Sequence, residues 1–487
     1  MIKFTREYLR DRIYACWLGK NIGGTMGTPF EGKREINDIQ GFTSEPGKPL
    51  PNDDLDLQLV WLRAVDELGP DAIDSKILGE YWISYIGPSW NEYGVCKANM
   101  RDGVLPPLSG ELHNEEWKHS NGAWIRTEIW ACLFPANPEK AIRCAFEDAS
   151  VDHGFGEGTY AAIFVAAMES AAFVIHDIRA LLDIGLSKIP EDCRVARSVR
   201  LVIDAYDRGI DWREARNIVV EDSADLGWFQ APANIAFTVI GLLYGEGDFK
   251  KSMILAINCG DDTDCTGATL GALMGIIHGT SIIPPDWQRY IGDDIITISI
   301  IRGFGLFPRT CQELTDCVMN LLPVTTRTDN MTLMQKGERR FSIDAKENDF
   351  GGVTAADFMG RAFVERMFNR SRYSFTAENV FAQAIVEFNR EPVIAAGGSL
   401  SGRVSVRLVR MCEQKRFSLR WYLPEGWTVT GGMSLHVNEM HSPHREHATA
   451  AFTLTAGDSV AGNNRLILEI ACAGRPTPLL VPITIIG

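Results

Sequence analysis

No stretch of the sequence reaches the roughly 18 uncharged apolar residues that a membrane-spanning helix requires. The most apolar segment, residues 160–175, is interrupted by Glu169. Residues 1–20 also lack a continuous apolar run, so we expect no secretory signal. The eleven cysteines contain no Cys-x-x-Cys pair and are odd in number, which argues against a disulfide framework. We therefore expect reduced thiols in a cytoplasmic protein.

A surplus of basic residues is also absent, since 48 Lys and Arg stand against 63 Asp and Glu, a net charge of −15. Nucleic acid and anionic membranes are polyanions that need a basic surface, so neither is expected as a partner. A small molecule remains as the expected partner, and the sequence does not indicate an oligomeric state. The 487 residues are enough for two or three domains with at least one large core.

Two sequence patterns divide the chain. Up to about residue 335, apolar residues recur at three- and four-residue spacing, which predicts a mostly helical domain, 1–335. From 336 to 487, short alternating or β-branched segments are separated by turn residues, which predicts a smaller antiparallel β-sandwich of immunoglobulin-like size. We expect a linker over 325–340 and one further helix over 355–368. The predicted helices include 56–68, 138–149, 160–175, 234–244 and 266–278, and the predicted strands are 402–409, 416–422, 427–430, 449–454, 465–471 and 479–486.

Two clusters of aspartates each come directly before a predicted helix. The first is Asn-Asp-Asp-Leu-Asp at 52–56, and the second is Cys-Gly-Asp-Asp-Thr-Asp-Cys-Thr at 259–266. Either cluster alone could simply cap its helix, because side-chain oxygens satisfy the free N–H groups there. A cap needs only one or two carboxylates, however, and further buried carboxylates repel one another unless a cation neutralises them. Together the clusters predict an oxygen-rich site for Mg²⁺, with Ca²⁺ or Mn²⁺ as substitutes.

The helix after the second cluster carries glycines at 267, 271 and 275. Each glycine costs a helix about 1 kcal/mol relative to alanine, so we expect another backbone to pack closely against this stripe. Other metal schemes fit less well, because the sequence has no His-Glu-x-x-His motif and no complete EF-hand loop. An aspartate-rich prenyl or terpene synthase is also helical and uses Mg²⁺, but its carboxylates lie within a helix rather than before it.

Several segments, which follow one another along the chain in the family's order, resemble the ADP-ribosylglycohydrolases, including the dinitrogenase reductase-activating glycohydrolases. Residues 260–271 resemble the family's Gly-Asp-Thr-Asp-Thr motif and its small-residue helix, and Asn-Asp-Asp-Leu stands where the family has Thr-Asp-Asp-Thr. The resemblance covers about 280 residues. The other matching segments are 18–31 (LGKNIGGTMGTPFE), 121–126 (NGAWIR) and 148–153 (DASVDH).

The resemblance implies an all-α ADP-ribosylglycohydrolase-like helical bundle with two Mg²⁺ ions and hydrolysis of an N- or O-glycosidic bond at the anomeric carbon of ribose. The metal ligands it implies are Asn52, Asp53, Asp54, Asp262, Asp264 and Cys265, and the implied catalytic residues are Glu31, Asp54 and Asp262. The implied substrate-binding residues are Asn121, Gly122, Trp124, Arg126 and His153. Leu55 and Cys265 depart from the family's threonines, and a neutral thiol is a poor ligand for a hard cation. Asp56, Asp261 and Thr266 are alternative oxygen donors.

Three functions remain open from the sequence. The first is hydrolysis of an ADP-ribosyl bond, the second is hydrolysis of a furanoside or other carbohydrate without phosphate, and the third is ligand binding without catalysis. Basic residues or a glycine loop at a helix start would favour ADP-ribose, and Arg126, Lys97 and Arg101 are the nearby candidates. Simpler roles are also open for several residues. Glu31 could be a solvated loop charge and His153 a turn residue. The histidines at 441, 444 and 447 could form a solvated cluster.

Overall fold

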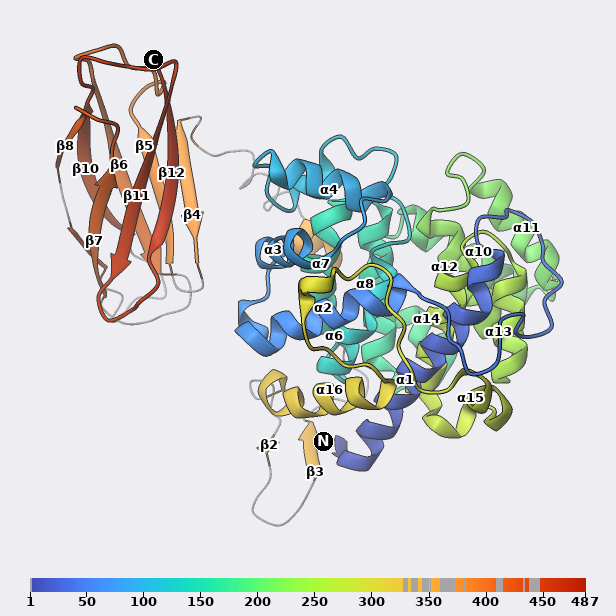
Figure 1. Cartoon of the computed structure of the whole chain (residues 1–487). Coiled ribbons are helices and arrows are strands. Elements are labelled where there is room, and N and C mark those ends of the chain that lie inside the picture. The colour runs from blue at the N-terminus through green and yellow to red at the C-terminus, as the bar shows by residue number, and fades with distance from the viewer. Residues whose placement is uncertain are drawn as a thin grey trace. The chain divides into compact units, whose positions relative to one another are not determined.

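The computed structural model describes residues 2–326, 332–333, 340–343, 350, 352–359, 371, 373–379, 382–408, 415–431, 434–437 and 447–487. The chain divides into two compact units, Met1–Gly360 and Arg361–Gly487, which are shown in Figure 1. Residues 340–343 and 355–359, beyond the expected boundary at 335, belong to the first unit. There residues 340–343 pair with residues 2–5, and Phe358 stacks on Phe146.

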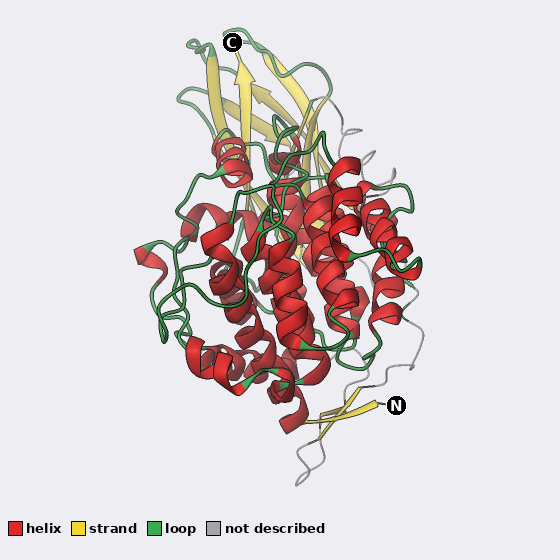
Figure 2. Ribbon diagram, turned by 90° about the vertical axis from the view of Figure 1, so that its right-hand side faces the viewer, coloured by secondary structure: helices red, strands yellow, loops and turns green. Residues whose placement is uncertain are grey.

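Helices dominate the first unit, as Figure 2 shows in red. Its α-helices are α1 (Arg6–Gly27), α2 (Asp53–Leu68), α3 (Ser75–Tyr85), α4 (Asn91–Arg101), α5 (Leu108–Glu111), α6 (Glu128–Leu133), α7 (Pro138–His153), α8 (Glu157–Ala171), α9 (Ile178–Leu186), α10 (Arg194–Asp207), α11 (Trp212–Asp222), α12 (Ala231–Tyr244), α13 (Phe249–Asn258), α14 (Thr263–His278), α15 (Pro285–Ile291), α16 (Cys311–Thr325) and α17 (Ala355–Met359). The 3-10 helices are η1 (Thr28–Phe30), η2 (Pro70–Ala72), η3 (Trp124–Arg126), η4 (Thr280–Ile282) and η5 (Arg302–Phe304).

The five helices predicted above are present, but the acidic clusters do not precede α2 and α14 as expected. Asn52 is the N-cap of α2, and its side chain accepts a hydrogen bond from the backbone N–H of Asp54 at 2.7 Å. Asp262 is the N-cap residue of α14. Asp53, Asp54 and Asp264 therefore lie in the first helical turns, where the positive end of the helix dipole faces their carboxylates.

Helices α1 and α14 pack backbone against backbone along a stripe of small residues. A Cβ atom added to Gly271 would lie 2.2 Å from the carbonyl oxygen of Gly19, and one added to Gly275 would lie 2.3 Å from that of Ala15. The expected close approach is therefore confirmed, with α1 as the partner helix. This contact also places the end of α1 beside the start of α14, where the Thr263 hydroxyl donates to the carbonyl oxygen of Gly27 at 2.9 Å.

The first unit also contains a small antiparallel sheet with the order β1-β3-β2. Its strands are β1 (Ile2–Thr5), β2 (Thr332–Leu333) and β3 (Arg340–Ile343). Among the described residues, no helix is long and apolar enough to cross a membrane. The cysteines in the described part of the chain are free thiols, nearly all of them buried.

The second unit consists of antiparallel sheets ordered β4-β5-β6-β10-β8 and β12-β11-β7-β9. Alternate residues of each strand enter one apolar core, as Leu466, Leu468 and Ile470 do on β11. The strands are β4 (Ser374–Glu378), β5 (Ala382–Phe388), β6 (Ser399–Leu408), β7 (Lys415–Tyr422), β8 (Thr428–Gly431), β9 (Ser434–Val437), β10 (His447–Thr455), β11 (Asn463–Cys472) and β12 (Leu479–Ile486). The six predicted strands are present, whereas β4, β5 and β9 were not predicted from the sequence. His441 and His444 lie outside the described residues, as does the expected helix beyond residue 359.

Candidate active site

The functional region forms where three chain segments meet. The close contact of α1 with α14 brings η1 and Glu31, which follow α1, to the start of α14. The start of α2 joins them because Asn52 packs on Gly24, where an added Cβ would lie 2.3 Å from the Asn52 side-chain nitrogen. That nitrogen also lies 3.4 Å from Asp264 Oδ2. The two acidic clusters, about two hundred residues apart in sequence, therefore share one site.

Two groups of possible metal ligands lie side by side in this site. One contains Asp54, Asp264 and Cys265, and the other contains Glu31, Asp262 and Asp264. Within each group the ligand atoms lie within 4.8 Å of one another. Because Asp264 belongs to both groups, the arrangement could hold two neighbouring cations that share this carboxylate.

Unsatisfied oxygen atoms provide a direct test of whether these residues suit a cation. Asp54 Oδ2, Asp262 Oδ1 and Asp264 Oδ1 are all buried and have no hydrogen-bond partner. The three side chains are 1%, 1% and 7% exposed. An unpaired buried carboxylate oxygen costs free energy, and oxygen-only ligation of a hard divalent cation removes that cost. The carboxylates therefore fit a bound divalent cation.

The pKa values in the metal-free site follow from burial and from mutual repulsion. Burial, reinforced by neighbouring carboxylates, raises the pKa of Asp54 and Asp264 well above the ordinary aspartate value. Burial and then Glu31 raise the pKa of Asp262 to about 7. Although part of Glu31 is exposed, desolvation of its carboxyl group, followed by Asp264 and Asp53, raises its pKa to about 8. The metal-free site therefore retains protons that a cation would displace.

The other oxygen and sulfur donors of the two motifs make contacts within the protein. Asp53 Oδ2 accepts from the Tyr93 hydroxyl at 2.9 Å, and the Cys265 thiol lies 3.6 Å from Asp54 Oδ1 as a donor. Asp56 Oδ2 accepts from the backbone N–H groups of residues 298 and 299, and the Thr266 hydroxyl donates to the carbonyl oxygen of Thr263. Asp261 lies 3.4 Å from Arg34. Asp56 and Asp261 belong to neither ligand group, although Asp56 Oδ1 and both Asp261 carboxylate oxygens lack a hydrogen-bond partner.

A cavity of about 310 Å³ opens beside the carboxylates. Eight of the residues expected in the site line it, namely Glu31, Asn52, Asp53, Asn121, Gly122, Asp262, Asp264 and Cys265. Asn121 is held in place because its side-chain nitrogen donates to Asp262 Oδ2 at 2.7 Å. Asp54 lies behind the lining as part of the first ligand group. The lining also includes residues that sequence reasoning did not assign, namely Thr28, Pro51, Trp90, Asn91, Glu92, Tyr93, Ile125, Trp228, Phe229 and Ile298.

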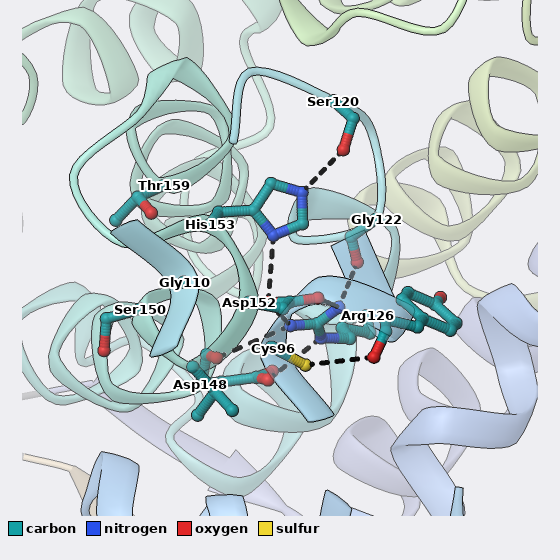
Figure 3. Close-up of polar contacts among 12 residues, drawn as sticks. Cys96, Gly110, Ser120, Gly122, Arg126, Asp148, Ser150, Asp152, His153 and Thr159 are labelled. Carbon is teal, nitrogen blue, oxygen red and sulfur yellow. Dashed lines mark hydrogen bonds and ion pairs between the residues drawn. The ribbon is translucent and has the colours of Figure 1, made fainter. Parts of the chain in front are cut away.

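Three residues expected to bind substrate lie behind the cavity wall and are 0% exposed, namely Trp124, Arg126 and His153. Figure 3 shows the Arg126 guanidinium group bonded to both Asp148 and Asp152, at 2.9 and 2.7 Å. Arg126 also donates to the carbonyl oxygen of Gly122. A ligand cannot reach a guanidinium group that is already enclosed in this way. The structure therefore gives Arg126 a supporting position in place of the expected substrate contact.

His153 and Trp124 support the same wall. His153 lies 2.9 Å from Asp152 Oδ1 through Nδ1 and 2.9 Å from the Ser120 hydroxyl through Nε2 (Figure 3). The indole N–H of Trp124 donates to Asn121 Oδ1 at 3.0 Å. Burial alone would raise the pKa of Asp152, but the ion pair with Arg126 lowers it below the ordinary value. These contacts hold the 120–122 turn, whose Asn121 and Gly122 line the cavity.

Glu92 is a buried acid of the cavity lining that sequence reasoning missed. It is 1% exposed, and its Oε2 atom has no hydrogen-bond partner. Burial and then Asp152 raise its pKa to about 8. Glu92 stands between the aromatic residues Trp90 and Tyr93 in the sequence, and an acid between aromatic residues was the available signal.

The fold and the site together define a helical domain with a cavity lined by carboxylates. The model of the ADP-ribosylglycohydrolase family matches residues 5–314, and the chain belongs to this family. The chain is also similar to a solved structure titled ADP-ribosylglycohydrolase-related protein complex, with 21% identity over 66% of this chain and 99% of that one and a TM-score of 0.45. No curated protein matches the chain.

Proposed function

We propose that the chain is a metal-dependent glycoside hydrolase that cleaves an N- or O-glycosidic bond at the anomeric carbon of a ribose. The observation that carries this proposal is the convergence of three unpaired, buried oxygens, on Asp54, Asp262 and Asp264, beside a cavity. Asp54, Asp262 and Asp264 would hold Mg²⁺, with Glu31 and Cys265 completing the two ligand groups. When bound, two divalent cations would supply Lewis-acid polarisation of water and would hold vicinal hydroxyl groups of a sugar.

The protein's own groups supply the proton chemistry. Glu31 faces the ligand groups, and in the metal-free site its pKa is raised to about 8. A bound cation would lower that pKa, so the carboxylate would lose its proton when the site is loaded. Such a carboxylate can take a proton from the attacking water and can then pass it to the departing aglycone. Asp53 and Asp262 add negative charge beside the sugar, which stabilises the positive charge that develops on the ring.

Two substrate classes follow from different observations. Family membership makes an ADP-ribosyl bond the first substrate to test. The cavity lining favours a riboside without phosphate, because no Lys, Arg or His is found among the described residues that line it.

Hydrolysis assays before and after metal removal test the proposed function. The full chain is stripped with EDTA and assayed with ADP-ribosylated protein and nitrophenyl ribofuranosides, with and without added Mg²⁺. We expect hydrolysis of at least one substrate that EDTA abolishes and Mg²⁺ restores. Saturable ligand binding by calorimetry without any turnover would instead support a non-catalytic binding protein.

A further inference from the structure

The two ligand groups of the site differ in one donor atom. One group offers carboxylate oxygens only, whereas the other, Asp54 with Asp264 and Cys265, offers two carboxylates and a sulfur. Among the described residues, no other group of possible metal ligands contains a cysteine. Carboxylate oxygens suit Mg²⁺, Ca²⁺ and Mn²⁺, whereas a thiolate favours Zn²⁺. The two positions are therefore chemically different.

The Cys265 side chain lies among carboxylates and not in an apolar part of the core. Its thiol donates toward Asp54 Oδ1, which lies 3.6 Å away, and also bonds to Asp262. The side chain is 5% exposed and lines the cavity. Because a thiol is a weak hydrogen-bond donor, it satisfies these carboxylates poorly, and Asp54 Oδ2 and Asp264 Oδ1 have no partner at all. The sulfur therefore lies where a cation would complete the group.

The spacing of the ligand atoms in this group fits a tetrahedral cation. Zn²⁺ binds sulfur at about 2.3 Å and carboxylate oxygen at about 2.0 Å, so a tetrahedral site separates these two ligand atoms by about 3.5 Å. The observed distance from Cys265 Sγ to Asp54 Oδ1 is 3.6 Å. Asp264 can add a third ligand, because one ligand atom from each of the three residues lies within 4.8 Å of the others. Three protein ligands beside a cavity leave a fourth position open, as in catalytic zinc sites.

Further oxygen ligands are scarce at the Asp54 position. Asn52, which was expected to be a ligand, uses its side-chain oxygen to accept from the backbone N–H of Asp54 at 2.7 Å. Asp53 belongs to neither ligand group, and its Oδ2 atom accepts from the Tyr93 hydroxyl. Ca²⁺ takes about six to eight oxygen ligands and Mg²⁺ requires an octahedral set, whereas Zn²⁺ needs only about four ligands in all. The number of donors at this position therefore also favours Zn²⁺.

We propose that Asp54, Asp264 and Cys265 bind Zn²⁺, while the neighbouring oxygen-only group binds a hard cation such as Mg²⁺. Cys265 selects the metal at its position. When the cation binds, the S–H bond breaks, a sulfur–zinc bond forms and the proton passes to the solvent. This inference rests on the proposed function, because it names the cation at one of the two positions of the same site.

Metal binding to the full chain tests this inference without any substrate. The protein is stripped with EDTA, dialysed with a phosphine reductant that keeps the thiols reduced, and titrated with Zn²⁺, Mg²⁺ and Co²⁺. Co²⁺ replaces Zn²⁺ as a coloured probe, because cobalt bound to a thiolate gives a charge-transfer band in the near ultraviolet. We expect this band in the wild type and its loss in Cys265→Ser. The same variant should bind Zn²⁺ at least about tenfold more weakly but change the Mg²⁺ affinity less than about threefold, because a hydroxyl group is a hard donor.

Cys259→Ser is the matched control. Cys259 belongs to the same motif and is 0% exposed, and its thiol donates to the carbonyl oxygen of residue 255 at 3.3 Å, which a serine hydroxyl can also do. It belongs to none of the ligand groups found among the described residues. We expect this variant to keep both the cobalt band and the Zn²⁺ affinity of the wild type.

Several results would overturn the inference. They are the absence of a cobalt–thiolate band in the wild type, a band that a folded Cys265→Ser retains, and equal Zn²⁺ affinity in Cys265→Ser and the control. If Cys265→Ser does not fold, X-ray absorption at the zinc edge decides on the wild type with one equivalent of Zn²⁺. A sulfur ligand at about 2.3 Å supports the inference, and oxygen or nitrogen ligands alone overturn it.

The binding measurements separate failure of this inference from failure of the proposed function. Metal-dependent hydrolysis without a cobalt–thiolate band keeps the function and removes the inference. A band that depends on Cys265, in a protein that cleaves no riboside, keeps the inference and removes the function. If none of the three cations binds, the inference is overturned, and the hydrolysis assay decides the proposed function.

Discussion

At the scale of single residues, Asp264 is the centre of the site, because it belongs to both ligand groups and keeps one buried oxygen without a partner. Asp54 and Asp262 each belong to one group only. Removing the shared carboxylate should therefore weaken both cation positions at once. The neutral Cys265 thiol, which donates toward Asp54, cannot replace it, since a hard cation prefers oxygen.

We predict that Asp264→Asn weakens Mg²⁺ binding by more than the roughly 10–100-fold that loss of an outer-shell partner costs. The amide has nearly the same shape but lacks the negative charge. Calorimetric titration of the EDTA-treated protein measures the effect. Asp458→Asn, an exposed residue of the second unit, is the matched control. Equal Mg²⁺ affinity in the Asp264 variant and the control would exclude Asp264 as a ligand.

The raised pKa values predict how pH changes the stability of the metal-free protein. A folded-state pKa above the unfolded value gives stability that is present at low pH and is lost as the pH rises through the folded-state pKa. For Asp262 and Glu31 the loss begins above the ordinary carboxyl pKa of about 4 and is complete at about pH 7 and about pH 8. We expect the thermal midpoint in EDTA to fall between pH 5 and pH 8 by this mechanism, and added Mg²⁺ to raise it most at the alkaline end. A stabilisation by Mg²⁺ that grows toward low pH would contradict this assignment.

At the scale of elements, the site depends on how closely α1 packs on α14, because this contact places Glu31 beside Asp262 and Asp264. The glycine stripe allowed the close approach to be predicted, but the sequence could not identify the partner helix. The partner has its own small residues, Ala15 and Gly19, more than 240 positions away, and nothing local marks the pairing.

Gly271→Ala should destabilise the first unit, although alanine is the better helix former. Its Cβ would lie 2.2 Å from the backbone oxygen of Gly19, which no change of rotamer can relieve. Overpacking of this kind costs about 1–3 kcal/mol, to be measured by chemical denaturation. Gly41→Ala, in the same unit with no atom within 4 Å of the added Cβ, should be neutral. Equal stability of both variants would show that α1 and α14 do not pack this closely.

The buried Arg126 network links η3 to α7. Arg126→Ala would leave Asp148 and Asp152 without their cation, and breaking a buried pair in this way costs about 3–5 kcal/mol. Removing an exposed helical pair with Arg208→Ala should cost only about 0.3–0.5 kcal/mol. Denaturant unfolding of both variants checks the difference. A loss for Arg126→Ala as small as that for Arg208→Ala would mean that the network is not formed.

At the scale of the whole molecule, the sequence allowed much of the architecture to be predicted because the spacing of apolar residues changes from helical to alternating. It also indicated the candidate ligands on α2 and α14, because carboxylates in compact motifs stand out locally. No motif marks Glu92 or Tyr93, which come from a helix start, as part of the cavity lining. Nor could the sequence show that Arg126 faces Asp148 and Asp152 instead of the cavity, since side-chain direction depends on packing with α7.

The residues of the site and of the cavity lining all belong to the first unit, whereas the second unit has an apolar core of its own. We therefore expect a chain that ends at Gly360 to bind Mg²⁺ with the affinity of the full chain. Calorimetry on both proteins measures this. Loss of binding in a truncated protein that circular dichroism shows to be folded would mean that the second unit contributes to the site.

The central claim is that the starts of α2 and α14 hold divalent cations together. The most direct measurement is a crystal structure of the protein with Mn²⁺, located by its anomalous scattering. We expect Mn²⁺ in direct contact with Asp54 Oδ2, Asp262 Oδ1 and Asp264 Oδ1. No anomalous peak at these oxygens, or a peak only at the neighbouring group of Glu92, Asp152 and His153, would contradict it.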